Sequence, residues 1–188
     1  MSEEDTDMVD IEMLKEMVMY ISEKCKNIDT YAYTHLNKIL HYSDIFWFAI
    51  HDESLSGEVY VKDKYGARAT NVKIAELKLV SDGYLQVQPK LFHNQWQSKP
   101  VVCKQYNYKL LTEEQKHHID KFIRKLANRT ASEVKKFNHE DFGWKTLKKN
   151  EVIPYESVFF LKPKKPISKK TMNWAKGVVR EFESETNA

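Results

Sequence analysis

Side chains that could form a catalytic centre are few in this sequence. Nucleophilic catalysis by a thiol needs a neighbouring base and a group that orients the base. Cys103, His139 and Asp141 have the required types. Cys103, however, lies in an apolar segment, and no local sequence signature of a cysteine nucleophile surrounds it. We therefore expect no catalysis through Cys103.

A second group has the side chains of a metal site. His41 and Asp44 are one helical turn apart, and His35 and His51 are near enough in sequence to add a ligand. Strong metal motifs have more ligands at closer spacing. We expect these residues to be polar side chains on the exposed edge of a helix and predict no bound metal.

Two further motifs are also weak. His117 and His118 point in directions about 100° apart on a helix, so they cannot bind one metal from a single face. Both are predicted to lie at the surface. A phosphate-binding loop needs clustered glycines, and the five glycines here are isolated: Gly57, Gly66, Gly83, Gly143 and Gly177. The sequence predicts no enzyme and no cofactor.

Composition points to one globular domain in a reducing compartment. The chain has 188 residues, of which 41% are hydrophobic, enough for one sizeable core. Cys25 and Cys103 fit neither a disulfide framework nor a zinc site. The longest apolar run, 45–50, is too short to span a bilayer, and the first ten residues are acidic, unlike a signal peptide. We expect a cytoplasmic protein without membrane contact.

The charge is distributed unevenly along the chain. The first 30 residues contain nine acids and three lysines, so the remainder carries a net charge of +9 within a total of +3. Such asymmetry fits a basic face for nucleic acid or for an acidic partner, and it also fits an ordinary solvated surface with an acidic tail. We predict a flexible acidic tail over 1–10 and one domain over 11–188.

Hydrophobic periodicity and capping signals predict about six helices. The second helix is nearly apolar all round at its end, which predicts a central buried helix. The six expected helices cover about 10–25, a stretch capped by Thr34 and running to about 50, one capped by Thr70 or Asn71 and ending at Asp82, one after the capping box at Thr112, a shorter one after the capping box at Thr130, and a C-terminal helix over 168–184.

Alternating segments predict strands over 58–63, 84–88 and 100–106, with a loop over 64–69. Pro89 should limit its strand to an edge or an early end. The predicted fold is α+β and mainly helical, with one small antiparallel sheet from the segments near Val59, Leu85 and Val102. Helix, strand, helix and two-stranded ribbon is also the order found in winged helices.

Several short motifs, in their order and spacing, resemble the Panacea domain, also called the SocA-like antitoxin domain. They are LNKILHYSD over 36–44, LSGEVY over 55–60 and the pair Tyr65-Gly66, followed downstream by 111–115, 130–134, His139-Glu140 with Trp144, and 153–155. The positions that carry the resemblance are Leu36, Lys38, Leu40, Tyr42, Asp44, Gly57, Tyr60, Tyr65, Gly66, His139 and Trp144. One departure is Gly66-Ala67, where the family commonly has Gly-Pro. That change makes the predicted loop less stiff.

The resemblance implies an antitoxin-like protein that binds and neutralises a cognate toxin. Such a toxin is usually encoded by an adjacent gene in a bacterial or phage genome. The resemblance implies no reaction. Within the predicted loop, Tyr65 and Arg68 are the candidate partner contacts, since both residue types are frequent interface hot spots.

A nucleic-acid-binding regulator is the alternative interpretation. It is favoured by the winged-helix-like order of elements and by five cations: Lys62, Lys64, Arg68, Lys73 and Lys78. Glu76 interrupts the lysines of the third helix, and the dense cation array typical of duplex binding is missing from the sequence. Toxin binding is therefore the preferred prediction.

Overall fold

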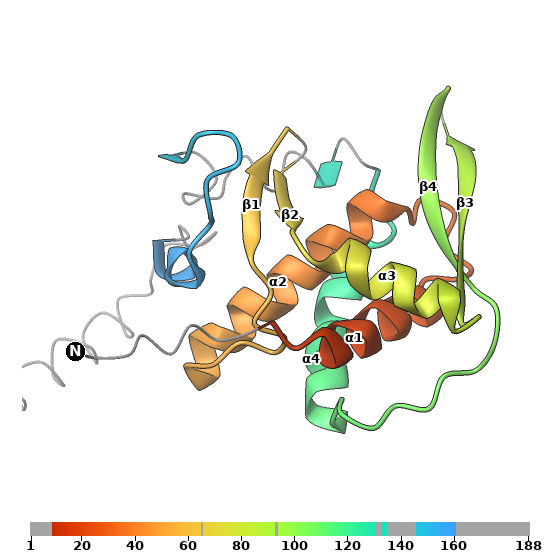
Figure 1. Cartoon of the computed structure of the whole chain (residues 1–188). Coiled ribbons are helices and arrows are strands. Elements are labelled where there is room, and N and C mark those ends of the chain that lie inside the picture. The colour runs from red at the N-terminus through yellow and green to blue at the C-terminus, as the bar shows by residue number, and fades with distance from the viewer. Residues whose placement is uncertain (1–8, 65, 93, 131–132, 135–145, 161–188) are drawn as a thin grey trace, which may run out of the picture.

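The computed structural model describes residues 9–64, 66–92, 94–130, 133–134 and 146–160. In this part of the chain the fold is α+β, as predicted, with four α-helices, one 3-10 helix and two β-hairpins (Figure 1). The elements in chain order are α1 (Ile11–Lys24), α2 (Tyr33–His51), β1 (Tyr60–Asp63), β2 (Gly66–Ala69), α3 (Val72–Ser81), β3 (Leu85–Phe92), β4 (Gln95–Val102), α4 (Glu113–Leu126) and the 3-10 helix η1 (Tyr155–Phe160).

Two helices start where the sequence predicts, α1 from its hydrophobic periodicity and α4 from its capping box. The carboxylate of Asp10 accepts the backbone N–H of Met13 at 2.9 Å, at the start of α1. At α4 the predicted capping box is present. The Thr112 hydroxyl accepts the N–H of Gln115 at 3.2 Å, and the Gln115 side chain accepts the N–H of Thr112 at 3.0 Å. These bonds satisfy amides that have no partner within the helix.

The start of α2 differs from the prediction. The helix begins at Tyr33 with Ala32 as its N-cap, so Thr34 lies inside the first turn and does not cap it. The ring of His35 accepts the N–H of Ala32 at 3.3 Å instead. The last turn is also less covered than its apolar sequence predicts, because the side chain of Ile50 is 68% exposed.

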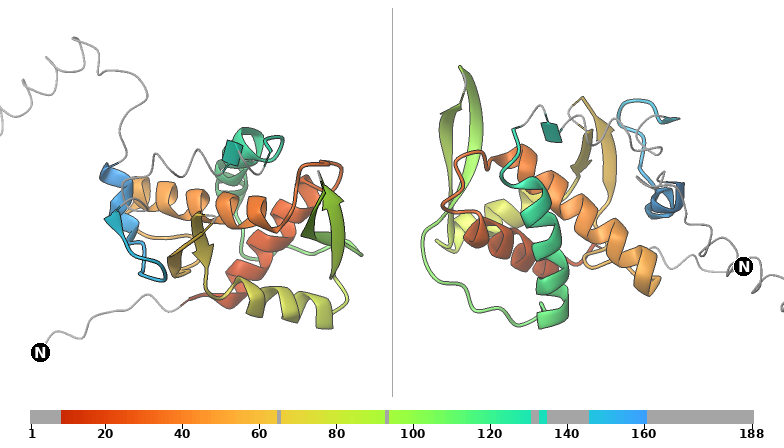
Figure 2. Two further views of the ribbon diagram at one scale, coloured as in Figure 1. Left: turned by 90° about the horizontal axis from the view of Figure 1, so that it is seen from above. Right: turned by 180° about the vertical axis from the view of Figure 1, so that it is seen from behind.

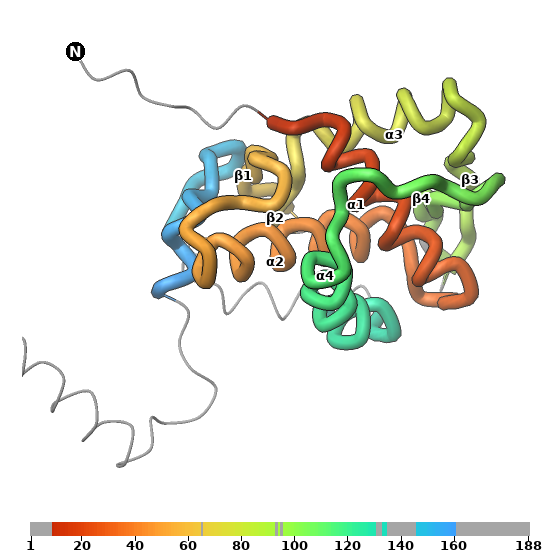
Figure 3. Tube along the Cα trace, turned by 90° about the horizontal axis from the view of Figure 1, so that it is seen from below, coloured from red at the N-terminus to blue at the C-terminus, as the bar shows by residue number. Residues whose placement is uncertain are grey.

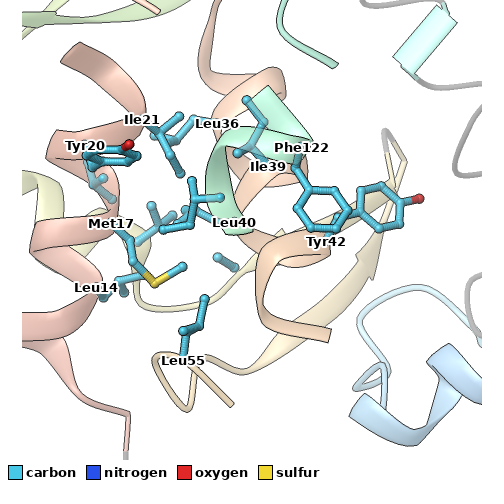
Figure 4. Close-up of a cluster of buried hydrophobic side chains, with 14 of the residues drawn as sticks. Leu14, Met17, Tyr20, Ile21, Leu36, Ile39, Leu40, Tyr42, Leu55 and Phe122 are labelled. Carbon is cyan, nitrogen blue, oxygen red and sulfur yellow. The ribbon is translucent and has the colours of Figure 1, made fainter. Parts of the chain in front are cut away.

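The hydrophobic core lies where α1, α2 and α4 cross. Figure 4 shows side chains from α1, such as Met17, meeting those from α2, such as Leu40, with Phe122 of α4 packed beside them. The ring of Tyr42 stacks on that of Phe122, with ring centroids 6.3 Å apart. Burying a leucine or phenylalanine side chain contributes about 1.5–3 kcal/mol, so this cluster supplies much of the stability of the fold.

The strands form two separate hairpins, so the prediction of one sheet is wrong. β1 pairs with β2 and β3 pairs with β4, both antiparallel. The segment 66–69, predicted as part of a loop, is strand β2. Closing a short local hairpin costs less chain entropy than recruiting a distant strand. The pairing that would join β1 to the ribbon of a winged helix is therefore not made by the described strands.

The second hairpin, which we call the arm, consists of β3, β4 and the turn between them. Its strands differ from the predicted segments 84–88 and 100–106, because β3 continues through Pro89 to Phe92, and β4 already begins at Gln95 and ends at Val102. Figures 1 and 2 show the arm standing out from the helices. Both strands of the arm are edge strands, and an edge strand can accommodate proline where its backbone nitrogen faces away from the other strand, because no hydrogen bond between the strands is lost there.

The chain between β4 and α4 passes over α1, as seen from below in Figure 3. The carboxylate of Glu16, buried in α1, accepts the N–H groups of Lys109, Leu110 and Leu111 at 2.7–3.0 Å. These bonds place α4 against the other helices.

The described C-terminal segment lies against β1. The amide N–H of Ile153 donates to the carbonyl oxygen of Tyr60 at 2.7 Å, and that of Asn150 donates to the carbonyl oxygen of Lys62 at 2.8 Å. The Thr130 capping box is formed, because the hydroxyl of Thr130 accepts the N–H of Glu133 at 3.3 Å and the carboxylate of Glu133 accepts the N–H of Thr130 at 2.8 Å. Most of the helix predicted after it, the helix over 168–184 and all but the last two residues of the tail over 1–10 fall outside the described residues.

No helix in the described part of the chain is both long enough and apolar enough to cross a membrane.

Candidate functional site

The motif residues of α2 divide into two groups by their surroundings. Leu36, Leu40 and Tyr42 lie in the hydrophobic core (Figure 4). Lys38 and Asp44 are polar, yet both are buried. A buried charge costs free energy unless it is paired or hydrogen-bonded. The partners of these two side chains therefore show what the motif does.

Asp44 holds the segment that leads into β1. Its carboxylate accepts the N–H groups of Leu55 and Ser56 at 3.1 Å, the Ser56 hydroxyl at 2.8 Å and the Tyr60 hydroxyl at 2.6 Å. Burial raises the pKa of Asp44 to about 6, although these donors act in the opposite direction. Gly57, at φ +63°, allows the chain to turn between these contacts.

Lys38 and Asn37 hold β2 on α2. The ammonium group of Lys38 donates to the carbonyl oxygen of Ala67 at 2.8 Å. The amide oxygen of Asn37 accepts the N–H of Ala69 at 3.0 Å. Gly66, at φ +111°, has a backbone conformation that other residues rarely adopt. The β1–β2 hairpin thus has a fixed position on α2.

Glu58 connects this hairpin to α3. Its buried carboxylate accepts the N–H groups of Thr70 and Asn71 at 3.0–3.1 Å, together with the Thr70 hydroxyl at 2.9 Å. Asn71 occupies the N-cap position, as predicted, but its side chain makes no capping bond. The N–H of this N-cap residue is bound by Glu58, thirteen positions earlier in the chain. Periodicity cannot find such a partner, although Glu58 lies within the LSGEVY motif.

His41 and Asp44 both lie inside the fold. Both are fully buried, so the prediction that they lie on an exposed helix edge is wrong. The oxygens of Asp44 bind Ser56 and Tyr60, whereas the ring of His41 stands edge-on to that of Tyr60. Burial, and to a lesser extent the charge of Lys38, lowers the pKa of His41 well below its usual value. Among the described residues, no three His, Cys, Asp or Glu side chains are grouped to hold a metal ion.

The remaining predicted residues have different outcomes. His118 is buried, contrary to the prediction, and its ring nitrogen is 3.0 Å from the carbonyl oxygen of Ser43 in α2. His117 is exposed, as predicted. Cys103 is an exposed free thiol. Its candidate partners at 139 and 141 lie outside the described residues, as do Tyr65 and Trp144.

A small surface pocket of about 100 Å³ lies between α2 and the β1–β2 hairpin. Lys38 and Arg68 are part of its lining, and the complete lining is Tyr33, Thr34, Asn37, Lys38, Asp63, Gly66, Ala67 and Arg68. Arg68 is in strand β2, not in a loop as predicted. Its side chain is 43% exposed, and its Nε lies 3.6 Å from the carboxylate of Asp63. An exposed guanidinium at the rim of a pocket can bind a carboxylate of another molecule.

Comparison with known families identifies one match. The model of the family described as "Antitoxin SocA-like, Panacea domain" matches residues 36–145. No curated protein and no solved structure matches the chain. The match begins at the first motif residue of α2 and includes both hairpins, α3 and α4.

Proposed function

We propose that this chain, which belongs to the SocA-like antitoxin family with the Panacea domain, is an antitoxin that binds and neutralises a toxin protein encoded by an adjacent gene. The family match over more than half of the chain is the observation that carries the proposal. The proposed role is protein binding without catalysis.

The hydrogen bonds of the motif residues support binding over catalysis. Asp44, Lys38 and Glu58 are the buried charged groups of the motifs that resemble the family, and each one binds backbone groups of this chain. A general acid or base needs to reach a substrate atom within hydrogen-bond distance. These side chains serve instead to position the β1–β2 hairpin and α3, which suits a rigid binding surface.

We propose Arg68 as a contact to the toxin, together with Tyr65 from the sequence prediction. Arg68 lies on a strand whose backbone position is fixed by Lys38 and Asn37, so little backbone entropy is lost when its side chain binds a partner. Its ionic contact with Asp63 is long and partly exposed, and such contacts contribute little. A carboxylate on the toxin can therefore replace Asp63 at low cost.

The nucleic-acid-binding alternative has weaker support. At least four of its five cations have partners within the chain. Lys62 donates to the carbonyl oxygen of Leu147, Lys73 pairs with Glu76, Lys78 lies 3.8 Å from Glu12, and Arg68 lies 3.6 Å from Asp63. A duplex-binding face relies on cations that are available to phosphates. Titration of random duplex DNA at several salt concentrations separates the two functions, since phosphate contacts give a steep salt dependence.

The test is growth rescue in cells that express the product of the adjacent gene. The wild-type chain should restore growth, and Arg68→Ala should reduce the rescue. Arg124→Ala, which removes another exposed arginine from α4, is the matched control and should rescue fully. Melting temperatures of both variants should stay close to that of the wild type. A neighbour without toxicity, or rescue without an isolable complex, contradicts the proposal.

A further inference from the structure

The arm has one apolar face that points into solvent. Residues paired across the two strands lie on the same face, and alternate pairs share it. The pairs Leu91–Trp96, Pro89–Ser98 and Val87–Pro100 therefore lie together. We call Val87, Pro89, Leu91, Trp96 and Ser98 the arm face. It carries no charge.

Exposure along the arm face increases toward the tip. Leu85, on the same side at the base, belongs to the hydrophobic core. Farther out, the exposed fraction is 36% for Val87, 53% for Leu91 and 72% for Trp96. Scattered exposed apolar residues are normal, but a contiguous apolar face that ends in a tryptophan is typical of an interaction site.

The opposite face of the arm is attached to the chain between α1 and α2. The ammonium group of Lys90 donates to the carbonyl oxygen of Asp29 at 2.7 Å and lies 3.3 Å from its carboxylate. That of Lys99 donates to the carbonyl oxygens of Lys26 and Ile28 at 3.3 Å. These bonds fix the orientation of the arm, so the arm face is presented to solvent before any partner binds.

The edges of the arm are protected against strand addition. The pairs Pro89–Ser98 and Val87–Pro100 are two residues apart along the hairpin. The hydrogen-bond pattern of an antiparallel pair repeats every two residues, so the nitrogens of both prolines have the same orientation relative to the opposite strand. A proline nitrogen in a two-stranded sheet is directed to the outer edge, where it cannot donate to an incoming strand. One such position is present on each strand. A partner must therefore pack on the side chains of the arm face.

The charges around the arm indicate the chemistry of that partner. From Gly83 to Thr112 the sequence contains four lysines and no acid, and the lysines are Lys90, Lys99, Lys104 and Lys109. Asp29 offsets one of them by its contact with Lys90. Acids of the helices also contact this segment, since Glu16 accepts the N–H of Lys109 and Glu23 accepts the hydroxyl of Tyr108. The arm face itself has no charged side chain, so it favours an apolar surface on a protein partner. A nucleic acid fits less well, because Lys90 and Lys99 lie on the face opposite Trp96 and bind the body of the protein.

We propose that the arm face is a docking surface for the toxin, which presents an apolar socket for the Trp96 indole. This inference rests on the proposed function and adds a second contact apart from Arg68. Tryptophan is enriched among residues that dominate binding energy, and its two side-chain torsions make it cheap to order.

The test measures binding of the purified adjacent-gene product to purified wild-type chain and its variants. Trp96→Ala should weaken binding by about thirtyfold or more, the effect of losing a hot spot. Leu91→Ala should weaken it by a smaller factor. Ile50→Ala is the matched control, because Ile50 is about as exposed as Trp96 but lies at the end of α2. The affinity of Ile50→Ala for the adjacent-gene product should stay within about twofold of the wild-type affinity.

Fluorescence gives an independent readout, because the difference between the spectra of the wild type and Trp96→Phe isolates the emission of Trp96. That emission should shift to shorter wavelength on complex formation, as the indole leaves water. If the wild type binds and both arm variants bind equally well, or if Trp96→Ala affects only self-association or DNA binding, the arm proposal is overturned and the proposed function stands. If the wild type itself does not bind, both fail.

Discussion

Replacing Asp44 by alanine should be among the most destabilising single changes in the chain. The substitution removes one acceptor from four donors, of which two are backbone N–H groups and two are the hydroxyls of Ser56 and Tyr60. Each buried donor left without a partner costs about 1–3 kcal/mol. Recovery of the cost of burying the carboxylate offsets part of that sum, so we expect a net loss of about 4 kcal/mol.

Asp44→Asn separates the hydrogen bonds from the charge. The amide oxygen can still accept both backbone N–H groups, so its loss at pH 7 should be much smaller than that of alanine. Urea unfolding followed by circular dichroism measures the free energy of unfolding for all three proteins. Equal stability of Asp44→Ala and wild type would refute the argument that Asp44 holds the segment before β1.

The pH dependence of the free energy of unfolding of the wild type and Asp44→Asn tests the effect of the buried charge of Asp44. Because the pKa of Asp44 rises from 3.8 to about 6 on folding, the folded protein binds this proton more tightly than the unfolded chain. The contribution of proton binding at Asp44 to the free energy of unfolding is fully present below about pH 4 and is lost as the pH rises through 6. The wild type should therefore lose up to about 3 kcal/mol relative to Asp44→Asn between pH 4 and 7. A constant difference over that range would contradict the raised pKa.

Two further predictions concern the neighbouring buried groups. Glu58→Ala should lower the free energy of unfolding by about 1–3 kcal/mol, because the N–H of Asn71 loses its acceptor, whereas the N–H of Thr70 keeps the carbonyl oxygen of Val59 at 3.0 Å. Glu58→Gln, measured in the same urea titration, should recover part of this loss, and an unchanged midpoint for the alanine variant would contradict the role given to Glu58. The His41 ring should stay neutral, so its NMR signals should not titrate between pH 5 and 8, whereas an inflection near 6.5 would show that the ring is solvated.

Local signals in the sequence predict the helices well and the hairpins less well. α4 is found from Thr112 and Gln115, because a capping box is complete within four residues. Strand β2, Gly-Ala-Arg-Ala, has no β-branched residue and no alternation, and it exists through contacts with Asn37 and Lys38 of α2. Such contacts depend on tertiary structure, which a local pattern does not contain.

The candidate site shows the same limit. Polar residues on a helix are usually exposed, which is why His41 and Asp44 were expected at the surface. Their burial depends on Ser56 and Tyr60, which lie 12 and 16 positions after Asp44. The motif order predicts the family correctly, whereas the exposure of Trp96 could not be predicted, because an aromatic residue between polar neighbours fits a core position as well as a surface one.

Light scattering on the size-exclusion elution of the two purified proteins, mixed at about ten micromolar, tests the central claim most directly. Neutralisation by direct binding predicts a single species whose mass is the sum of whole numbers of both chains and whose formation accompanies growth rescue. Separate elution of this chain and the adjacent-gene product at their own masses, with rescue still observed in cells, would contradict neutralisation by direct binding.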